Sequence, residues 1–172
     1  MNNLKNLSIL FILGFIVLSC EKDDGPSQLG TLQLGNDEYS LTHGIIRNWG
    51  QLNAGQENYN YTLEVSNAQI VYFSSGNSNY EEGGIGLNFE LYSSDSELIL
   101  DGDYSYEPTH IPYSFITGYI ISHDSENERV IKNGVISFKN SDSGYEIDYK
   151  GITTVGDSVI CNYKGDLTTI VE

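Results

Sequence analysis

Carboxylates are the side chains of this chain that offer the most chemistry, and two of them flank a single glycine. Asp101 and Asp103 enclose Gly102, and Asp95 and Glu97 precede them by a few residues. Hard oxygen ligands that converge on a bend suit calcium, so Asp101 and Asp103 are the candidate metal ligands. The spacing lacks the regular ligand ladder of an EF-hand loop, and a plain acidic turn is the simpler interpretation.

The sequence gives little support to other kinds of catalytic or metal site. A carboxylate pair could hydrolyse a glycosidic bond, but with 24 Asp and Glu residues some pair always looks suitable. His43, His110 and His123 are far apart and lack metal-ligand spacing. The chain has no Gly-x-Ser-x-Gly elbow and no glycine-rich phosphate loop after an expected strand. No catalytic residue is therefore assigned, and no cofactor other than calcium is considered.

Aromatic side chains are the candidates for ligand contact, namely Trp49, Tyr104, Tyr106 and Tyr113. The last three fall in or beside a run that contains two prolines and a histidine, which indicates loops. Flat rings at the edge of a rigid sheet suit a sugar face or a protein partner, because they offer a large contact area at small entropic cost. The alternative is that tyrosine fills half-buried strand positions, where it is favoured in any case.

The amino-terminal residues have the three parts of a secretory signal. Lys5 lies in a polar start, an apolar core of about a dozen residues follows, and the small residue Ser19 precedes the expected cleavage point. The core is shorter than the ~20 residues that a membrane-spanning helix needs. We therefore expect residues 1–19 to be a signal peptide, residues 20–30 to be a flexible acidic tether, and residues 31–172 to be a single domain.

Val17-Leu18-Ser19-Cys20 resembles the lipobox of bacterial lipoproteins, and the resemblance implies that Cys20 is acylated and becomes the new amino terminus. The residues after it, Lys22, Asp23 and Asp24, resemble the export signal of surface lipoproteins in Bacteroidota. The resemblance implies lipid anchoring in the outer membrane with exposure at the cell surface. The alternative for this acidic run is a solvated spacer.

Composition narrows the classes of partner. The formal net charge is −16, which argues against nucleic acid and against charge attraction to an anionic membrane surface. The lipid is thus the expected membrane contact, and the domain is expected to be a monomer. With Cys20 committed to lipid, Cys161 has no intramolecular partner, so we expect it to pack as a small hydrophobe.

Thirteen Tyr, 18 Gly and 3 Pro accompany repeated two-residue alternation, which predicts many short strands and no helical layer. The expected strands are 39–41 with 45–46, 59–66, 69–73, 87–91, 97–100, 115–122, 135–139, 145–150 and 158–164. In 59–66 the odd positions are expected to face the core and the even positions water. By the same alternation Glu90 is expected to face water, and Ile136, Phe138 and Cys161 are expected to face the core. The fold class is all-β, an antiparallel β-sandwich of about nine or ten strands, with an open or closed β-barrel as the alternative.

The last three strands are expected to form a meander whose first hairpin turns through 140–144. These strands, with the segments 133–138, 145–149 and 159–167 and the earlier 100–106, resemble the carboxy-terminal part of small uncharacterised Bacteroidota lipoproteins. The matching elements are strands and turns, so the resemblance implies fold and location. The expected function is a non-enzymatic binding or accessory module with a glycan or an outer-membrane or host protein as ligand. The alternatives are a polysaccharide hydrolase with paired carboxylates and a purely structural surface protein.

Overall fold

A computed structural model describes residues 27–53, 57–72, 78–123 and 129–171. These residues form strands and turns, and no helix occurs among them. The strands are Gly30–Leu34 (β1), Asp37–Leu41 (β2), His43–Gln51 (β3), Tyr59–Ser66 (β4), Ile70–Tyr72 (β5), Ser78–Tyr80 (β6), Ile85–Ser93 (β7), Gly102–Tyr106 (β8), Ser114–Ser122 (β9), Arg129–Ile131 (β10), Val135–Ser141 (β11), Gly144–Ile152 (β12), Ser158–Gly165 (β13) and Thr168–Val171 (β14).

Twelve of these strands belong to one sheet, in the order β14-β3-β4-β7-β9-β8-β11-β12-β13-β1-β2 with β10 beside β9. β5 and β6 form a separate two-stranded sheet. The all-β prediction is confirmed, but the expectation of a purely antiparallel sheet is wrong. β14 pairs with β3, and β8 pairs with β9, in parallel. Alternation along a single strand cannot reveal either of these parallel pairings.

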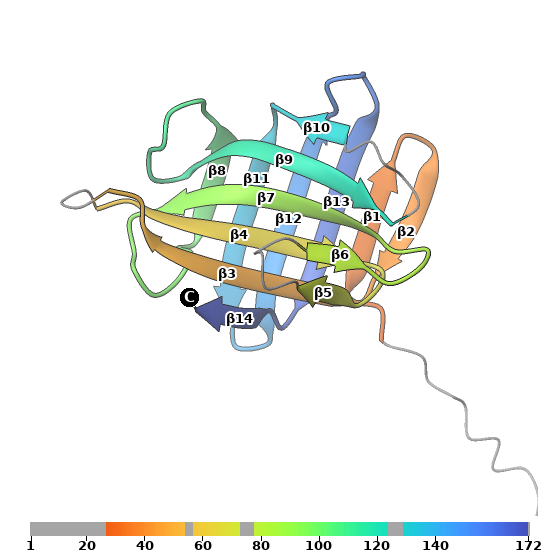
Figure 1. Ribbon diagram of the computed structural model, residues 1–172, viewed down its shortest axis with the longest axis horizontal. Coiled ribbons are helices and arrows are strands. Elements are labelled where there is room, and N and C mark those ends of the chain that lie inside the picture. Colours follow the sequence, from red (N-terminus) through yellow and green to blue (C-terminus); the bar gives the residue numbers. More distant parts are fainter. Residues whose placement is uncertain (1–26, 54–56, 73–77, 124–128, 172) are drawn as a thin grey trace, which may run out of the picture.

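The large sheet is strongly curved and forms a half-barrel. In Figure 1, β3, β4, β7 and β9 run across the front, and β8, β11, β12, β13, β1 and β2 run behind them in a different direction. Only Thr42 separates β2 from β3, so one bent stretch of chain pairs with β1 in one half and with β4 in the other. The concave side of the sheet is therefore enclosed by its own two halves.

Aromatic rings fill the centre of this core. Phe89 lies 5.2 Å from Phe115 and 4.8 Å from Tyr149, measured between ring centroids. Gly118 of β9 faces Phe89, and a Cβ atom at Gly118 would stand 2.7 Å from the Cδ1 atom of that ring. The glycine makes room for the ring, because real Cβ contacts are never so short. Apolar burial of this kind is the main favourable contribution to folding.

Three buried tyrosines donate hydrogen bonds from their hydroxyl groups to backbone carbonyl oxygens in the turns. The hydroxyl of Tyr61 donates to the carbonyl oxygen of Asp95, and that of Tyr104 donates to Leu100. Tyr149 donates in the same way to Asn133. Each of these three rings thus packs in the core while its hydroxyl group hydrogen-bonds to the backbone of a turn.

The carboxy-terminal meander is confirmed. β11 pairs with β12 and β12 with β13, and Ile136 and Phe138 stand opposite Tyr149 and Ile147. All four side chains are buried, as is Cys161 of β13. Both strands extend further into the first hairpin than expected, to Ser141 and Gly144. The residues near the turn are polar and show no apolar alternation, although the backbone pairing of β11 with β12 continues there.

Two other local predictions are wrong. The segment 97–100 forms no strand, although Ile99 is buried. On β4 the even positions were expected to face water, yet Glu64 and Ser66 are buried. At this end of β4 the outer face is covered, since Ser66 pairs with Gly86 of β7 and the hydroxyl of Tyr80 on β6 lies directly over Gly86.

The first strand of the described residues, β1, begins at Gly30. The expected signal peptide (1–19), the expected lipidation site Cys20 and the expected export signal Lys22, Asp23 and Asp24 lie outside the described residues. Within the part of the chain that the structure describes, no helix has the length and apolarity to cross a membrane.

Candidate functional site

The outer face of β3, β4 and β7 carries an exposed tryptophan at a β-bulge. The register of β3 with β4 shifts between Asn48 and Gly50, and Trp49 is the extra residue. Gly50 has φ +82°, a conformation that favours glycine, and its N–H donates to Asn48 Oδ1 at 2.8 Å. The bulge turns Trp49 outward, and 41% of its surface is exposed.

Two contacts hold the Trp49 ring in place. The indole Nε1 donates to Thr62 Oγ1 on β4 at 2.7 Å. The guanidinium carbon of Arg47 lies 4.9 Å from the ring centroid, and Arg47 itself is only 4% exposed. A buried cation against one face of an indole is a favourable arrangement. The exposed part of the ring therefore belongs to its opposite face and edge, in a fixed orientation.

A hydrogen-bonded polar cluster adjoins this ring along β4 and β7. Asn60 Nδ2 donates to Glu90 Oε1 at 3.1 Å, and the Tyr92 hydroxyl donates to the same oxygen at 2.5 Å. Tyr92 is fully buried, and desolvation together with the bond to Glu90 raises the pKa of its hydroxyl. The hydroxyl therefore remains a proton donor and fixes the Glu90 carboxylate.

The amides of Asn58 and Asn60 each leave an oxygen to spare. The nitrogen of Asn58 donates to the carbonyl oxygen of His110, and that of Asn60 donates to Glu90. Both partners are acceptors, so neither amide can be turned around without losing its bond. Within the described part of the chain, the Oδ1 atoms of both residues are buried and lack a hydrogen-bond partner. Each of these oxygens can still accept a hydrogen bond.

The loop between β8 and β9 closes over this cluster. The His110 ring packs edge-on against Tyr92 at 4.9 Å between centroids. Tyr113 has φ +61°, a strained value for a residue with a side chain. Its N–H donates to the backbone carbonyl oxygen of Tyr92, and its own carbonyl oxygen accepts from the N–H of Ser105. The backbone of Tyr113 thus ties the loop to β7 and β8, and these bonds hold the strained conformation.

The structure separates the four aromatic candidates. Trp49 is exposed on the outer face, whereas Tyr104 is fully buried in the core and Tyr106 is partly buried against Phe115. Tyr113 is 41% exposed and lies 5.4 Å from Tyr104 between ring centroids. Tyr104 and Tyr113 are brought together, but Trp49 lies on the opposite side of the sheet. The aromatic candidates therefore do not form one patch.

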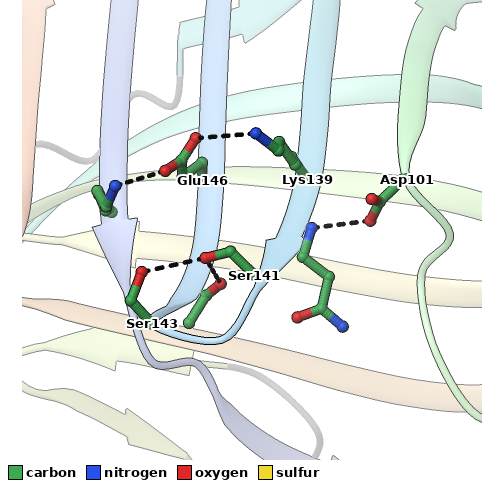
Figure 2. Close-up of polar contacts among 8 residues, drawn as sticks. Asp101, Lys139, Ser141, Ser143 and Glu146 are labelled. Carbon is green, nitrogen blue, oxygen red and sulfur yellow. Dashed lines mark hydrogen bonds and ion pairs between the residues drawn. The ribbon is translucent and has the colours of Figure 1, made fainter.

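The two acidic candidates act as hydrogen-bond acceptors at the junction of β8 and β11. Asp101 Oδ1 accepts from the backbone N–H of Asn140 at 2.8 Å, and Asp103 Oδ1 accepts from Ser137 Oγ at 2.5 Å. Figure 2 shows the Asp101 carboxylate directed at the β11 backbone. Among the described residues, no group of three or more His, Cys, Asp and Glu side chains could hold a metal ion.

The solvent-exposed face of β11, β12 and β13, in the other half of the sheet, carries a short charge ladder. Glu146 of β12 lies between two lysines, with Lys164 Nζ at 2.5 Å and Lys139 Nζ at 4.0 Å (Figure 2). The hydrogen bond from Lys164, helped by the charges of both lysines, lowers the pKa of the Glu146 carboxyl. These pairs are exposed to solvent, so they add little to stability.

Comparison with protein-family models, with curated proteins and with solved structures gives no match. The assignment of a function therefore depends on the arrangement of the side chains themselves.

Sequence reasoning found Trp49 but missed the residues around it. Alternation predicted that Asn60, Thr62 and Glu90 face away from the core. An outward-facing tryptophan on the neighbouring strand lies on the same face, so this alternation is the signal that could have grouped these residues with Trp49. Arg47 and Tyr92 could not be found in this way, because one is a buried cation and the other a buried ring on the outer face.

Proposed function

We propose that the chain is a non-enzymatic binding module, held at the cell surface by lipid on Cys20, whose ligand is a glycan bound at Trp49. One observation carries the proposal. An exposed indole has its orientation set by Thr62 and Arg47 and stands beside a polar cluster with a spare acceptor on Asn60.

The chemistry of the site suits a sugar. The apolar face of a pyranose ring packs on an aromatic ring, and its hydroxyl groups donate to fixed acceptors. The Glu90 carboxylate and the Asn60 amide oxygen are such acceptors, and their hydrogen bonds hold them in position. A platform that is already ordered loses little conformational entropy when it binds, which increases its affinity for the ligand.

The proposal is tested by screening the full chain on a glycan array and measuring the best ligand by calorimetry. Trp49→Ala is expected to weaken binding by tenfold or more, and Trp49→Phe by less, because part of the stacking surface remains. Ile152→Ala is the matched control, since it removes a similarly exposed apolar side chain from β12, in the other half of the sheet. A glycan whose affinity is unchanged in Trp49→Ala, or silence on the array, would overturn the glycan assignment.

A protein ligand is the second outcome of the same test. If the array is silent, cross-linking on intact cells should capture an outer-membrane or host protein, and capture should be lost in Trp49→Ala. Capture that is independent of Trp49 would place the partner on another face.

The anchor is proposed from the residues at the amino terminus, and it has its own test. Cys20→Ala should move the protein from the detergent phase to the aqueous phase. Replacing Lys22, Asp23 and Asp24 by Ala should protect the domain from protease added to intact cells. Unchanged partition would refute acylation at Cys20, and equal digestion of both forms would leave the acidic run as a spacer.

For the finer architecture we propose a β-sandwich in which the two halves of the curved sheet are the layers. The support is the continuous stretch β2–β3, which serves both halves.

A further inference from the structure

A pocket of about 400 Å³ lies where the chain enters β1, at the opposite end of β3 from Trp49. Its wall is built by four segments that are distant in sequence: Leu29 before β1, residues 42–45 at the junction of β2 and β3, residues 69–70 at β5, and residues 166–168 before and at the start of β14. The volume is within the range of small-ligand sites, roughly 300 to 1,000 Å³.

The hydrogen bonds around Thr42 decide the tautomer of His43, which lines this pocket. Thr42 Oγ1 donates its single hydrogen to the carbonyl oxygen of Asn67 at 3.2 Å. The 2.8 Å contact between Thr42 Oγ1 and His43 Nδ1 can be a hydrogen bond at the same time only when the ring donates it, which is the tautomer with the hydrogen on Nδ1. In the neutral ring the other nitrogen, Nε2, is left as an acceptor.

A carboxylate lies on the same wall. Asp166 lines the pocket, and its backbone carbonyl accepts a hydrogen bond of 2.7 Å from the Tyr163 hydroxyl. Gly44 is packed tightly behind it, because a Cβ there would stand 2.5 Å from both Leu167 Cδ2 and the Tyr163 oxygen. The crossing from β13 to β14 is therefore fixed, and with it the position of Asp166.

The remaining wall combines the aliphatic side chains of Leu29, Ile45 and Ile70 with the polar residues Thr42, Gln69 and Thr168. The pocket thus combines an imidazole acceptor and an anionic carboxylate with aliphatic surface, in a chain whose net charge is −16. A ligand that complements it carries several hydrogen-bond donors, a positive charge and a short apolar body. We propose that this pocket binds a primary ammonium group on an aliphatic chain, which donates to Asp166 and to His43 Nε2.

The probe is n-butylammonium, titrated calorimetrically into the full chain in non-ionic detergent, with n-butanol and n-butyrate as matched probes of the same length. Saturable binding of butylammonium, at least tenfold tighter than butanol and with no binding of butyrate, is expected. Equal binding of all three probes, or no saturable heat for butylammonium, would overturn the proposal. Nα-acetyl-lysine amide distinguishes the sources, since only a pocket that accepts a protein lysine binds it as tightly as butylammonium.

Single substitutions test which side chains contact the ammonium group. Asp166→Asn should weaken butylammonium binding by tenfold or more, whereas Asp157→Asn, which removes the same charge from the turn after β12, should change it by less than twofold. Thr42→Val removes the group that positions His43, so it should weaken binding and change the imidazole ¹⁵N shifts that report the tautomer. An Asp166→Asn protein that melts like the parent and binds butylammonium equally well would refute the assignment. Failure at this pocket leaves glycan binding at Trp49 unaffected.

Discussion

The indole Nε1 of Trp49 donates a hydrogen bond of 2.7 Å to Thr62 Oγ1 across the pair β3–β4. This bond joins the extra residue of a β-bulge to the regular strand beside it and sets the ring on the outer face. A bulge alone would leave the indole free to turn about its side-chain torsions, whereas the bond to Thr62 and the Arg47 guanidinium restrict it.

Replacing Thr62 by Val tests that restriction. The loss of one exposed hydrogen bond should lower the free energy of unfolding by about 0.5–1.5 kcal/mol and increase the motion of the ring. Because Trp49 is the single tryptophan, its fluorescence anisotropy decay reports this motion directly. Thr117→Val on β9 makes the same change and should leave the decay as it is. An unaltered decay in Thr62→Val would mean that Arg47 holds the ring alone.

Gly118 and Phe89 should show strong coupling. A methyl group at Gly118 would overlap the Phe89 ring, so Gly118→Ala should destabilise the fold by about 1–3 kcal/mol. Phe89→Leu should also destabilise it through lost packing, but the double variant should be more stable than the sum of the two losses implies. Urea unfolding of the four proteins measures this, and strictly additive losses would contradict the contact.

Cys161 should be unreactive in the folded protein. Burial and the nearby Asp148 charge raise the pKa of its thiol to about 12, so the thiolate is scarce at neutral pH and has no access to reagent. In a Cys20→Ala chain, where Cys161 is the only thiol, modification by iodoacetamide at pH 8 should proceed only as fast as the domain unfolds. Rapid modification without urea would show that this end of β13 opens locally.

The buried tyrosine hydroxyl groups should lower the stability of the fold at alkaline pH. Burial raises the pKa of Tyr61 and of Tyr163 from 10.0 to about 12, with a smaller contribution from neighbouring carboxylates. Above pH 10 the unfolded chain loses these protons before the folded chain does, so stability falls as the pH rises and the contribution is gone above pH 12. Urea unfolding between pH 8 and 11 should show the decline, with tyrosinate absorbance appearing only on unfolding. A constant free energy of unfolding over this range would contradict it.

The two lysines beside Glu146 should act unequally on its carboxyl group. Lys164 lies nearer than Lys139, so Lys164→Gln should raise the pKa of Glu146 towards its usual 4.5 by more than Lys139→Gln does. Titration of the side-chain carboxyl by ¹³C NMR measures both shifts. The ranking should fade in high salt because the pair is exposed, and an equal effect of both substitutions would contradict the geometry.

Local patterns were sufficient to predict much of the sheet. Alternation placed β4, β7 and the meander β11–β13, together with the inward side of Ile136, Phe138 and Cys161, because a side chain on a strand can face only one of two sides. Alternation failed at Glu64 and Ser66, because whether an outer face meets water depends on another segment, here the hairpin of β5 and β6.

The sequence by itself determined the all-β class and the burial of the unpaired Cys161. These follow from composition and from a period of two along single strands. Only the tertiary structure decided the parallel pairing of β14 with β3, the separation of Trp49 from Tyr104, and the meeting of His43 with Asp166 in one pocket. Those relations join residues that are far apart along the chain, and a local pattern carries no information about which distant strand or turn will be its neighbour.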